Sequence, residues 1–260
     1  MNDGGVRDPM EAEFDTVAAW TEAAVAALGQ EYAIPSACRG SGSPADLTWL
    51  AEGLDLHGDR RFLDAGAGIG GPAAWLAEHL SGPWAGRGLL TDPMPHAVAA
   101  ARRLFGFPAV AAWSEATPLV DDAVDAAWCL GVLCTTTEKR ALLRELHRVL
   151  RPGGRLGLLV LVARTVPLPE SPEGNDFPTD ASLDEDLAAS GFRVDDRIDA
   201  AELPDAPAWW TERADRVEEE ITRLHRDDPA WDEADAQQQV MGRLIGGRHV
   251  VTVLLRTTAV

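Results

Sequence analysis

The sequence RFLDAGAGIGGPAAW, residues 61–75, decides the fold of this chain. It opens on Phe62 and Leu63, a short apolar run typical of a strand buried on both faces of a parallel sheet. The pattern D-x-G-x-G-x-G follows at residues 64–70, and glycines at this spacing let the backbone turn sharply and approach a bound molecule. Pro72 suits the first turn of a helix, because its missing N–H is not needed there. The stretch therefore predicts a strand, a glycine-rich turn and a helix N-terminus, where an adenosine-bearing cofactor commonly sits.

The rest of the chain alternates apolar, strand-like segments with amphipathic, helix-like ones. The first predicted elements are a helix at 9–29, a Gly-, Ser- and Pro-rich loop at 32–44, and a short helix capped by Ser43 or Asp46. Further strands are expected at 88–91, 109–113, 124–130, within 150–162, at 192–198 and at 249–256. Further helices are expected at 69–80 and 96–105, after a capping box of Thr135 and Glu138, and after one of Ser182 and Glu185. This order predicts a doubly wound, Rossmann-like α/β sheet of seven strands.

About fifty residues separate the last two predicted strands, far more than a usual connection. They contain Trp209, Trp210 and Trp231 and are typical of two acidic amphipathic helices, which we interpret as a lid. We expect one domain, residues 1–260, with three parts. These are an N-terminal helical or lid segment (1–58), a cofactor-binding core (59–164), and a C-terminal sheet half (165–260) with the lid insertion at about 200–247.

The formal net charge of −19 disfavours nucleic acid as a partner, because phosphates demand a basic surface. Residues 180–240 hold 19 acidic side chains against 6 arginines, which fits either attraction of a cationic substrate or a solvated surface. No apolar run is long enough for a membrane span, and no secretory leader is recognisable. Cys38, Cys129 and Cys134 lack C-x-x-C spacing, so neither a disulfide framework nor a zinc site is expected. A cytoplasmic protein is the simple interpretation.

Four motifs in order carry a resemblance to a known family: LDAGAGIGG (63–71), LLTDP (89–93), ATPLVDDAVDAAW (116–128) and LRPGG (150–154). Over residues 61–162 the chain resembles class I S-adenosylmethionine-dependent methyltransferases of the small-molecule, UbiE-like (methyltransferase-11-like) branch with a helical cap. The resemblance implies S-adenosyl-L-methionine as cofactor, a small-molecule methyl acceptor, no metal, and an antiparallel last strand. Together with the Ala- and Arg-rich composition, it points to bacterial secondary metabolism. It leaves a homodimer open.

The resemblance also implies cofactor contacts at the strand ends. Asp64 and the glycine turn would border the methionine moiety, and Asp92 would accept hydrogen bonds from the ribose hydroxyls, since a carboxylate has acceptors only. Met94 would pack against the adenine, and Gly131 would lie beside the sulfonium. Locally, each Asp could instead bond amides of its turn or cap a helix. The expected cofactor-binding residues are Asp64, Gly66, Ala67, Gly68, Gly70, Asp92, Pro93, Met94, Trp113, Ser114, Glu115, Leu130 and Gly131.

One position departs from the family pattern. Trp113 stands where relatives often carry an acidic residue that contacts the adenine. Either Glu115 replaces the missing acceptor, or the Trp113 ring packs on the adenine; the sequence leaves both open.

Residues able to act as a base are sparse, and no catalytic residue is assigned. The candidates are Cys134, His249, His96 and Tyr32, the last as a lid contact. Methyl transfer needs a base only when the acceptor loses a proton of high pKa. Trp20, Trp209 and Trp210 either wall an acceptor pocket or form the core of the cap.

Two other functions compete with methyl transfer. Gly66, Gly68 and Gly71 also satisfy G-x-G-x-x-G, as in nicotinamide-dependent oxidoreductases, but Tyr32 and Lys139 lie too far apart for a short-chain dehydrogenase pair. The second alternative keeps the fold and the cofactor but catalyses a cyclisation or rearrangement, or serves as a non-catalytic partner.

Overall fold

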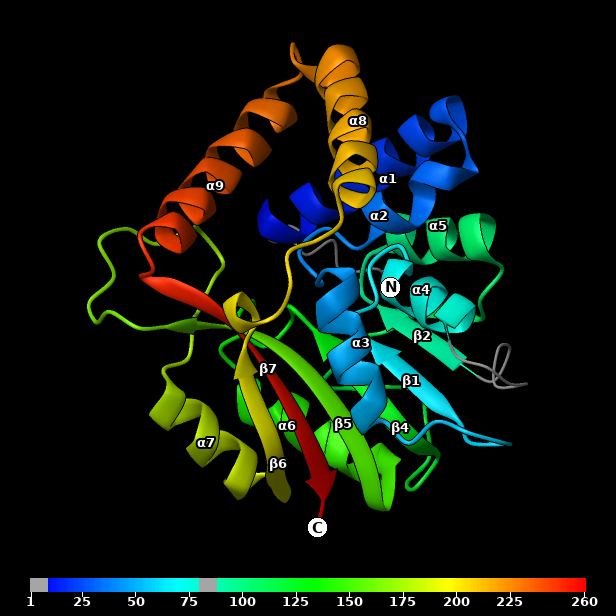
Figure 1. Ribbon diagram of the computed structural model, residues 1–260, viewed down its shortest axis with the longest axis vertical. Helices are drawn as coiled ribbons and strands as arrows, with labels where there is room; N and C mark the ends of the chain where they lie inside the picture. Colours follow the sequence, from blue (N-terminus) through cyan, green and yellow to red (C-terminus); the bar gives the residue numbers. More distant parts are fainter. Residues whose placement is uncertain (1–8, 80–87) are drawn as a thin grey trace, which may run out of the picture.

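The computed structural model describes residues 9–79 and 88–260, and its framework is a seven-stranded sheet in the order β3-β2-β1-β4-β5-β7-β6 (Figure 1). Neighbouring strands pair in parallel from β3 across to β5, whereas β7 pairs antiparallel with both β5 and β6. The predicted doubly wound, Rossmann-like sheet with an antiparallel last strand is therefore confirmed. The strands are β1 (Phe62–Ala65), β2 (Gly88–Asp92), β3 (Ala109–Ala111), β4 (Val124–Leu130), β5 (Leu150–Ala163), β6 (Phe192–Asp199) and β7 (Val250–Ala259).

Both faces of the sheet are covered, which explains why its central strands read as continuous apolar runs. Along β5, Leu158 and Val160 pack with α6 and α7, whereas Leu159 points to the opposite face, toward α3 and α4. The two-residue period of a strand thus distributes one apolar segment between two cores. The helices are α1 (Pro9–Leu28), α2 (Ala33–Ala37), α3 (Pro44–Gly53), α4 (Gly71–His79), α5 (Pro95–Phe105), α6 (Lys139–Val149), α7 (Asp180–Ala189), α8 (Ala208–His225) and α9 (Pro229–Gly246).

The start of α3 is as predicted, and the start of α6 is not. The Ser43 side chain accepts from the Asp46 amide while the Asp46 side chain accepts from the Ser43 amide, a reciprocal capping box. The expected box of Thr135 and Glu138 is wrong. Glu138 is itself the N-cap residue, without a side-chain cap, and the helix begins at Lys139.

Two further boundaries are corrected. The second capping box joins Thr179 and Ser182 rather than Ser182 and Glu185, so α7 begins three residues earlier than expected. The stretch 32–44 is not a continuous loop, because Ala33–Ala37 forms the one-turn helix α2. The predicted C-terminus of α4 at residue 80 lies outside the described residues.

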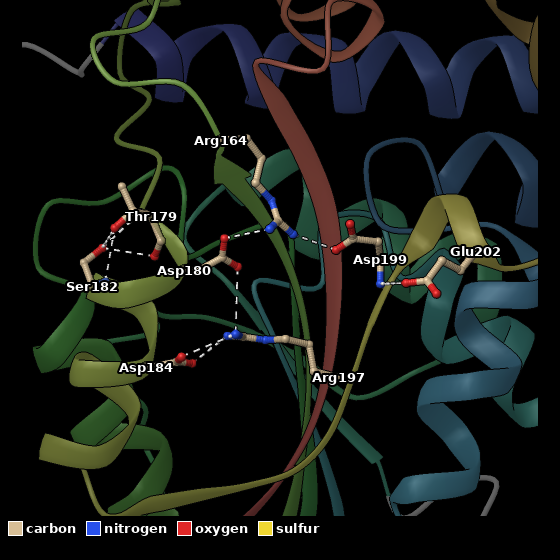
Figure 2. Close-up of polar contacts among 8 residues, drawn as sticks. All are labelled: Arg164, Thr179, Asp180, Ser182, Asp184, Arg197, Asp199 and Glu202. Carbon is tan, nitrogen blue, oxygen red and sulfur yellow. Dashed lines mark hydrogen bonds and ion pairs between the residues drawn. The ribbon is translucent and has the colours of Figure 1, made fainter.

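The polypeptide leaves the sheet after β6, forms α8 and α9, and returns in β7; Figure 1 shows both helices with α1 at one end of the molecule. The corner where they leave is held by ion pairs (Figure 2). Arg164, just after β5, bridges Asp180 at the start of α7 (2.8 Å) and Asp199 at the end of β6 (2.7 Å). Arg197 of β6 contacts Asp184 of α7 at 2.7 Å. These contacts join the end of β5, the helix α7 and the strand β6 near the point where the chain leaves the sheet for the helical cap (α1, α2, α8 and α9).

Candidate active site

The glycine turn after β1 forms the floor of the site. Gly66, Gly68 and Gly70 all have positive φ angles, of 73°, 53° and 89°, which side-chain-bearing residues rarely adopt. A Cβ at Gly66 would lie 2.3 Å from a methyl of Val132, whereas a Cβ at Gly68 would meet nothing within 4 Å. The turn is therefore packed against the protein on one side and open on the other.

Asp92, at the end of β2, ties this turn to the next helix. One carboxylate oxygen accepts from the Gly68 amide at 2.8 Å, and the other accepts from the Met94 amide at 2.9 Å. Burial raises the pKa of Asp92, and these two backbone hydrogen bonds oppose that effect. The residue thus supports its turn, and each carboxylate oxygen retains a further acceptor position. It also lines the cavity described below.

Asp64, in β1, is a buried carboxyl whose Oδ2 has no hydrogen-bond partner among the described residues. The residue is 1% exposed. Burial, and secondarily the charge of Asp92, raises the pKa of Asp64 to about 7. A buried polar group without a partner is costly. Its position at the base of the glycine turn suits a ligand that brings a hydrogen-bond donor or a positive charge.

A cavity of about 1040 Å³ opens above the glycine turn, between the sheet and the cap. The expected cofactor residues that line it come from the ends of four strands, and they are Gly66, Ala67, Gly68, Asp92, Pro93, Met94, Trp113, Ser114, Glu115, Leu130 and Gly131. Asp64 and Gly70 are not on its surface. The cavity is at the upper limit of ordinary small-molecule pockets, so it has room for a nucleotide and a second molecule.

The segment after β3 bears on the choice between Trp113 and Glu115. Trp113 is 50% exposed and lines the cavity. Glu115 instead accepts a hydrogen bond from the Thr136 hydroxyl at 3.2 Å, which joins it to the loop after β4. Both side chains line the cavity, so both interpretations stay predictions: Trp113 offers a ring face, and the Glu115 carboxylate retains acceptor positions besides its contact with Thr136.

Of the four candidate catalytic residues, only Cys134 lines the cavity. Its thiol donates to the Gly131 carbonyl at 3.3 Å, and burial raises its pKa to about 11, so it is neutral near pH 7. His96 instead faces Asp15, whose carboxylate accepts from its backbone amide and contacts Nδ1 at 2.8 Å. His249 contacts the Thr165 hydroxyl, and Tyr32 packs beside α8. No histidine occurs among the described residues that line the cavity.

Some of the tryptophans lie in the wall of the cavity and others lie outside it. Trp20 and Trp231 line the cavity. Trp210 is buried in the core beneath the cap, and Trp209 is half exposed beside it; neither lines the cavity.

Sequence reasoning missed the opposite wall of the cavity, which comes from three segments far apart in the chain. Arg39, after α2, contacts Glu218 of α8 at 2.5 Å and also Gln238 of α9. In the loop after β5, the Glu173 amide donates to Gln237 of α9 at 3.2 Å. In the sequence, only the long Pro-rich loop after residue 166 and the acidic insertion at about 200–247 indicated that additional segments cover the sheet, and neither predicted a specific contact.

The described residues, 9–79 and 88–260, hold neither a metal-binding cluster nor a membrane-spanning helix. No group of three or more His, Cys, Asp or Glu side chains there is arranged to hold a metal ion. No helix there is long and apolar enough to cross a membrane.

Residues 63–158 match the family model for the methyltransferase domain. This range runs from β1 into β5 and contains every strand end that borders the cavity floor. Residues 63–158 therefore form a methyltransferase domain. The methyltransferase domain therefore supplies the floor, whereas the cap and the loop after β5 supply the roof.

The methyltransferase domain has relatives in sequence and in structure. Methyltransferase GfsG of Streptomyces halstedii is 33% identical over 120 residues, which are 44% of this chain and 42% of that protein. The match thus spans less than half of the curated relative. The [4+2]-cyclase SpnF superposes with a TM-score of 0.64 at 26% identity, over 82% of this chain and 79% of its own. The geranyl diphosphate C-methyltransferase of Streptomyces coelicolor A3(2), solved with S-adenosyl-L-homocysteine, superposes with a TM-score of 0.59 at 17% identity. The superposition covers 83% of this chain and 77% of that protein, and it shows the fold alone.

Proposed function

We propose that this chain binds S-adenosyl-L-methionine and transfers its methyl group to a small-molecule acceptor in bacterial secondary metabolism. The observation that carries the proposal is the buried carboxyl of Asp64 at the base of the glycine turn, whose Oδ2 has no hydrogen-bond partner among the described residues, with Asp92 at the next strand end. Asp64 would hold the amino group of the methionine moiety, and Asp92 would accept from the ribose hydroxyls. The two carboxylates would thus hold opposite ends of one elongated cofactor.

The methyltransferase domain and the cap divide the remaining work. S-adenosyl-L-methionine supplies a methyl group already activated on a sulfonium, so the protein must chiefly orient the acceptor and exclude water. Residues 59–164 would hold the cofactor, and the insertion at about 200–247 would cover the acceptor. Arg39, bonded to both α8 and α9, would keep that cover in place.

The chemistry of the cavity wall limits the acceptors. Cys134 is a neutral thiol, and no described histidine faces the cavity. Acceptors that need no strong base are therefore favoured, such as a neutral amine, a thiol or an activated carbon.

A second candidate is a cyclisation or rearrangement on the same fold. Its support is the similarity to the cyclase SpnF at 26% identity, together with the absence of histidine from the described residues that line the cavity. A nicotinamide-dependent oxidoreductase has less support. Lys139, the only lysine, is held by Asp176 at 2.6 Å and by the Thr136 carbonyl at 2.7 Å, and it does not line the cavity.

Calorimetry with S-adenosyl-L-homocysteine and with NADP⁺ tests the cofactor assignment. We expect saturable heat with the first and none with the second. The matched variants are Asp92→Asn, expected to weaken binding at least tenfold, and Asp59→Asn, which removes an exposed carboxylate of the same type and should leave binding unchanged. Tight NADP⁺ binding without S-adenosyl-L-homocysteine binding would reverse the proposal.

Incubation with radiolabelled S-adenosyl-L-methionine and a panel of amine, thiol and carbon acceptors then separates the two candidate reactions. Label in the acceptor, with one S-adenosyl-L-homocysteine formed per transfer, identifies methyl transfer. Conversion of a polyene to a cyclic isomer of equal mass, without label, identifies the cyclase activity.

A further inference from the structure

One face of α9 turns large apolar side chains toward the cavity. Met241 and Ile245 lie one helical turn apart and line it together with Ala234 and Gln237, at the spacing that places residues on one helix face. Ile245 is 45% exposed although it is aliphatic. The apolar side of the helix is therefore incompletely covered where it borders the cavity.

The wall contributed by the sheet has the same character. Leu159 and Leu161 of β5 and Thr252 of β7 line the cavity. They lie outside the strand ends expected to hold the cofactor. The space bounded by these residues and the α9 face, which we call the α9 subsite, is the part of the same cavity that adjoins Gly131, whose amide donates to the Leu159 carbonyl at 2.9 Å.

The charges around the α9 subsite disfavour an anion. Arg39 is the only basic residue among the described ones that line the cavity, and its guanidinium is already bonded to Glu218 and Gln238. The other charged side chains that line the cavity near α9 are carboxylates, including Glu173 and Asp235; Arg243 of α9 lies outside that lining and is paired with Glu170 at 2.8 Å. A phosphate, sulfonate or carboxylate placed here would meet negative charge without a free cation to balance it.

We propose that the α9 subsite binds the acceptor, and that the acceptor is a bulky, mainly apolar molecule without an anionic group. The identification of the ligand as the methyl acceptor rests on the proposed function, whereas the α9 subsite as a binding site does not depend on that function. Ile245 and Met241 determine specificity: they contact the apolar body of the ligand and take no part in the chemistry.

Two fluorescent probes with one fluorophore test both parts of the proposal. Dansyl amide is neutral, and dansyl sulfonate carries one negative charge. We expect saturable, one-site enhancement of dansyl amide emission in the full chain, and at least tenfold weaker binding of dansyl sulfonate. Equal binding of the two probes would overturn the exclusion of anions.

A matched pair of substitutions locates the probe. Ile245→Asp should weaken dansyl amide binding at least tenfold, because it places a charge in the α9 subsite. Leu224→Asp changes an aliphatic residue of similar exposure, 49%, on α8 away from the cavity, and should alter binding less than twofold. Equal losses in the two variants, or no loss in Ile245→Asp, would overturn the α9 subsite.

Calorimetry with S-adenosyl-L-homocysteine on the same proteins checks folding and keeps the two proposals apart. Retained binding in Ile245→Asp shows that the variant is folded and that only the α9 subsite changed. If S-adenosyl-L-homocysteine fails to bind the parent chain while dansyl amide behaves as expected, the proposed function fails and the subsite stands. The reverse result removes the subsite and leaves the cofactor assignment intact.

Discussion

Replacing Asp64 with Asn is expected to stabilise the ligand-free protein at high pH, even though it alters the proposed cofactor site. Burial raises the pKa of Asp64 from 3.8 to about 7. Below pH 3.8 the carboxyl is neutral in the folded and unfolded chains, so it costs nothing. As the pH rises toward 7, the unfolded chain releases this proton while the folded chain keeps it, and stability falls. Above pH 7 the carboxyl is ionised in both the folded and the unfolded chains, so the loss of stability stays constant.

The size of the effect follows from the difference between the two pKa values. A difference of about 3 corresponds to roughly 4 kcal/mol of unfolding free energy above pH 7. Asparagine is neutral throughout, so the variant escapes this loss. Its advantage over the parent chain should therefore grow by about 3 kcal/mol between pH 5 and pH 8.5. Urea unfolding of both proteins at the two pH values measures it, with Asp59→Asn as the control for an exposed carboxylate. An advantage that does not change with pH would refute the reasoning.

The same substitution should have the opposite effect on ligand binding. Asp64→Asn removes the charge proposed to hold the amino group, so the Kd for S-adenosyl-L-homocysteine should rise at least tenfold at pH 8.5. In the parent chain, affinity should increase as the pH rises through about 7, because binding draws on the ionised form. Undiminished binding by the variant would show that Asp64 does not contact the ligand.

Three other changes test separate parts of the structure. Trp113→Ala should raise the Kd for S-adenosyl-L-homocysteine about fivefold or more in calorimetry, since a stacked base is worth about 1–3 kcal/mol. Trp113→Phe should stay within about threefold, and equal losses in the two variants would argue against stacking. Cys134 should resist iodoacetamide at pH 7.5 in mass spectrometry, because a buried thiol with a pKa of about 11 supplies almost no thiolate; rapid alkylation in the folded protein would contradict this. Gly71→Ala should lower Tm by several degrees, because its Cβ would lie 2.4 Å from the Ala37 carbonyl carbon. The control Gly242→Ala, with open space around it in α9, should leave Tm unchanged or raise it.

The sheet was predictable from sequence because its signals are local. The segment around Phe62 and Leu63 is apolar, the glycine turn follows at once, and the wholly apolar run of β5 is equally plain. Helix starts were less predictable where several cap residues compete. Thr135, Thr136 and Glu138 all suit a helix start, and the choice depends on a distant contact. Lys139 bonds both the Thr136 carbonyl and Asp176 of the loop after β5, so tertiary structure selects the boundary.

The two halves of the cavity differ in the same way. The floor comes from successive strand ends, so one ordered set of motifs names its residues together. The roof joins Arg39, Glu173 and the face of α9, which no motif connects. The spacing of Met241 and Ile245 is equally that of a helix packed on a core, and only the arrangement of α9 over the sheet shows that part of this face is uncovered.

The segment that contains α8 and α9 leaves the sheet from β6 and returns to it in the adjacent strand β7. Asp199, the last residue of β6, is paired with Val253 of β7, so the departing and returning chains meet at one edge. Both ends of the helical hairpin formed by α8 and α9 are therefore attached at the same end of the β6–β7 pair. Replacement of the hairpin would leave the backbone hydrogen bonds between β6 and β7 intact. Evolution or protein engineering can therefore replace residues 200–249 with a different helical hairpin and change the acceptor specificity while the cofactor-binding part of the sheet stays the same.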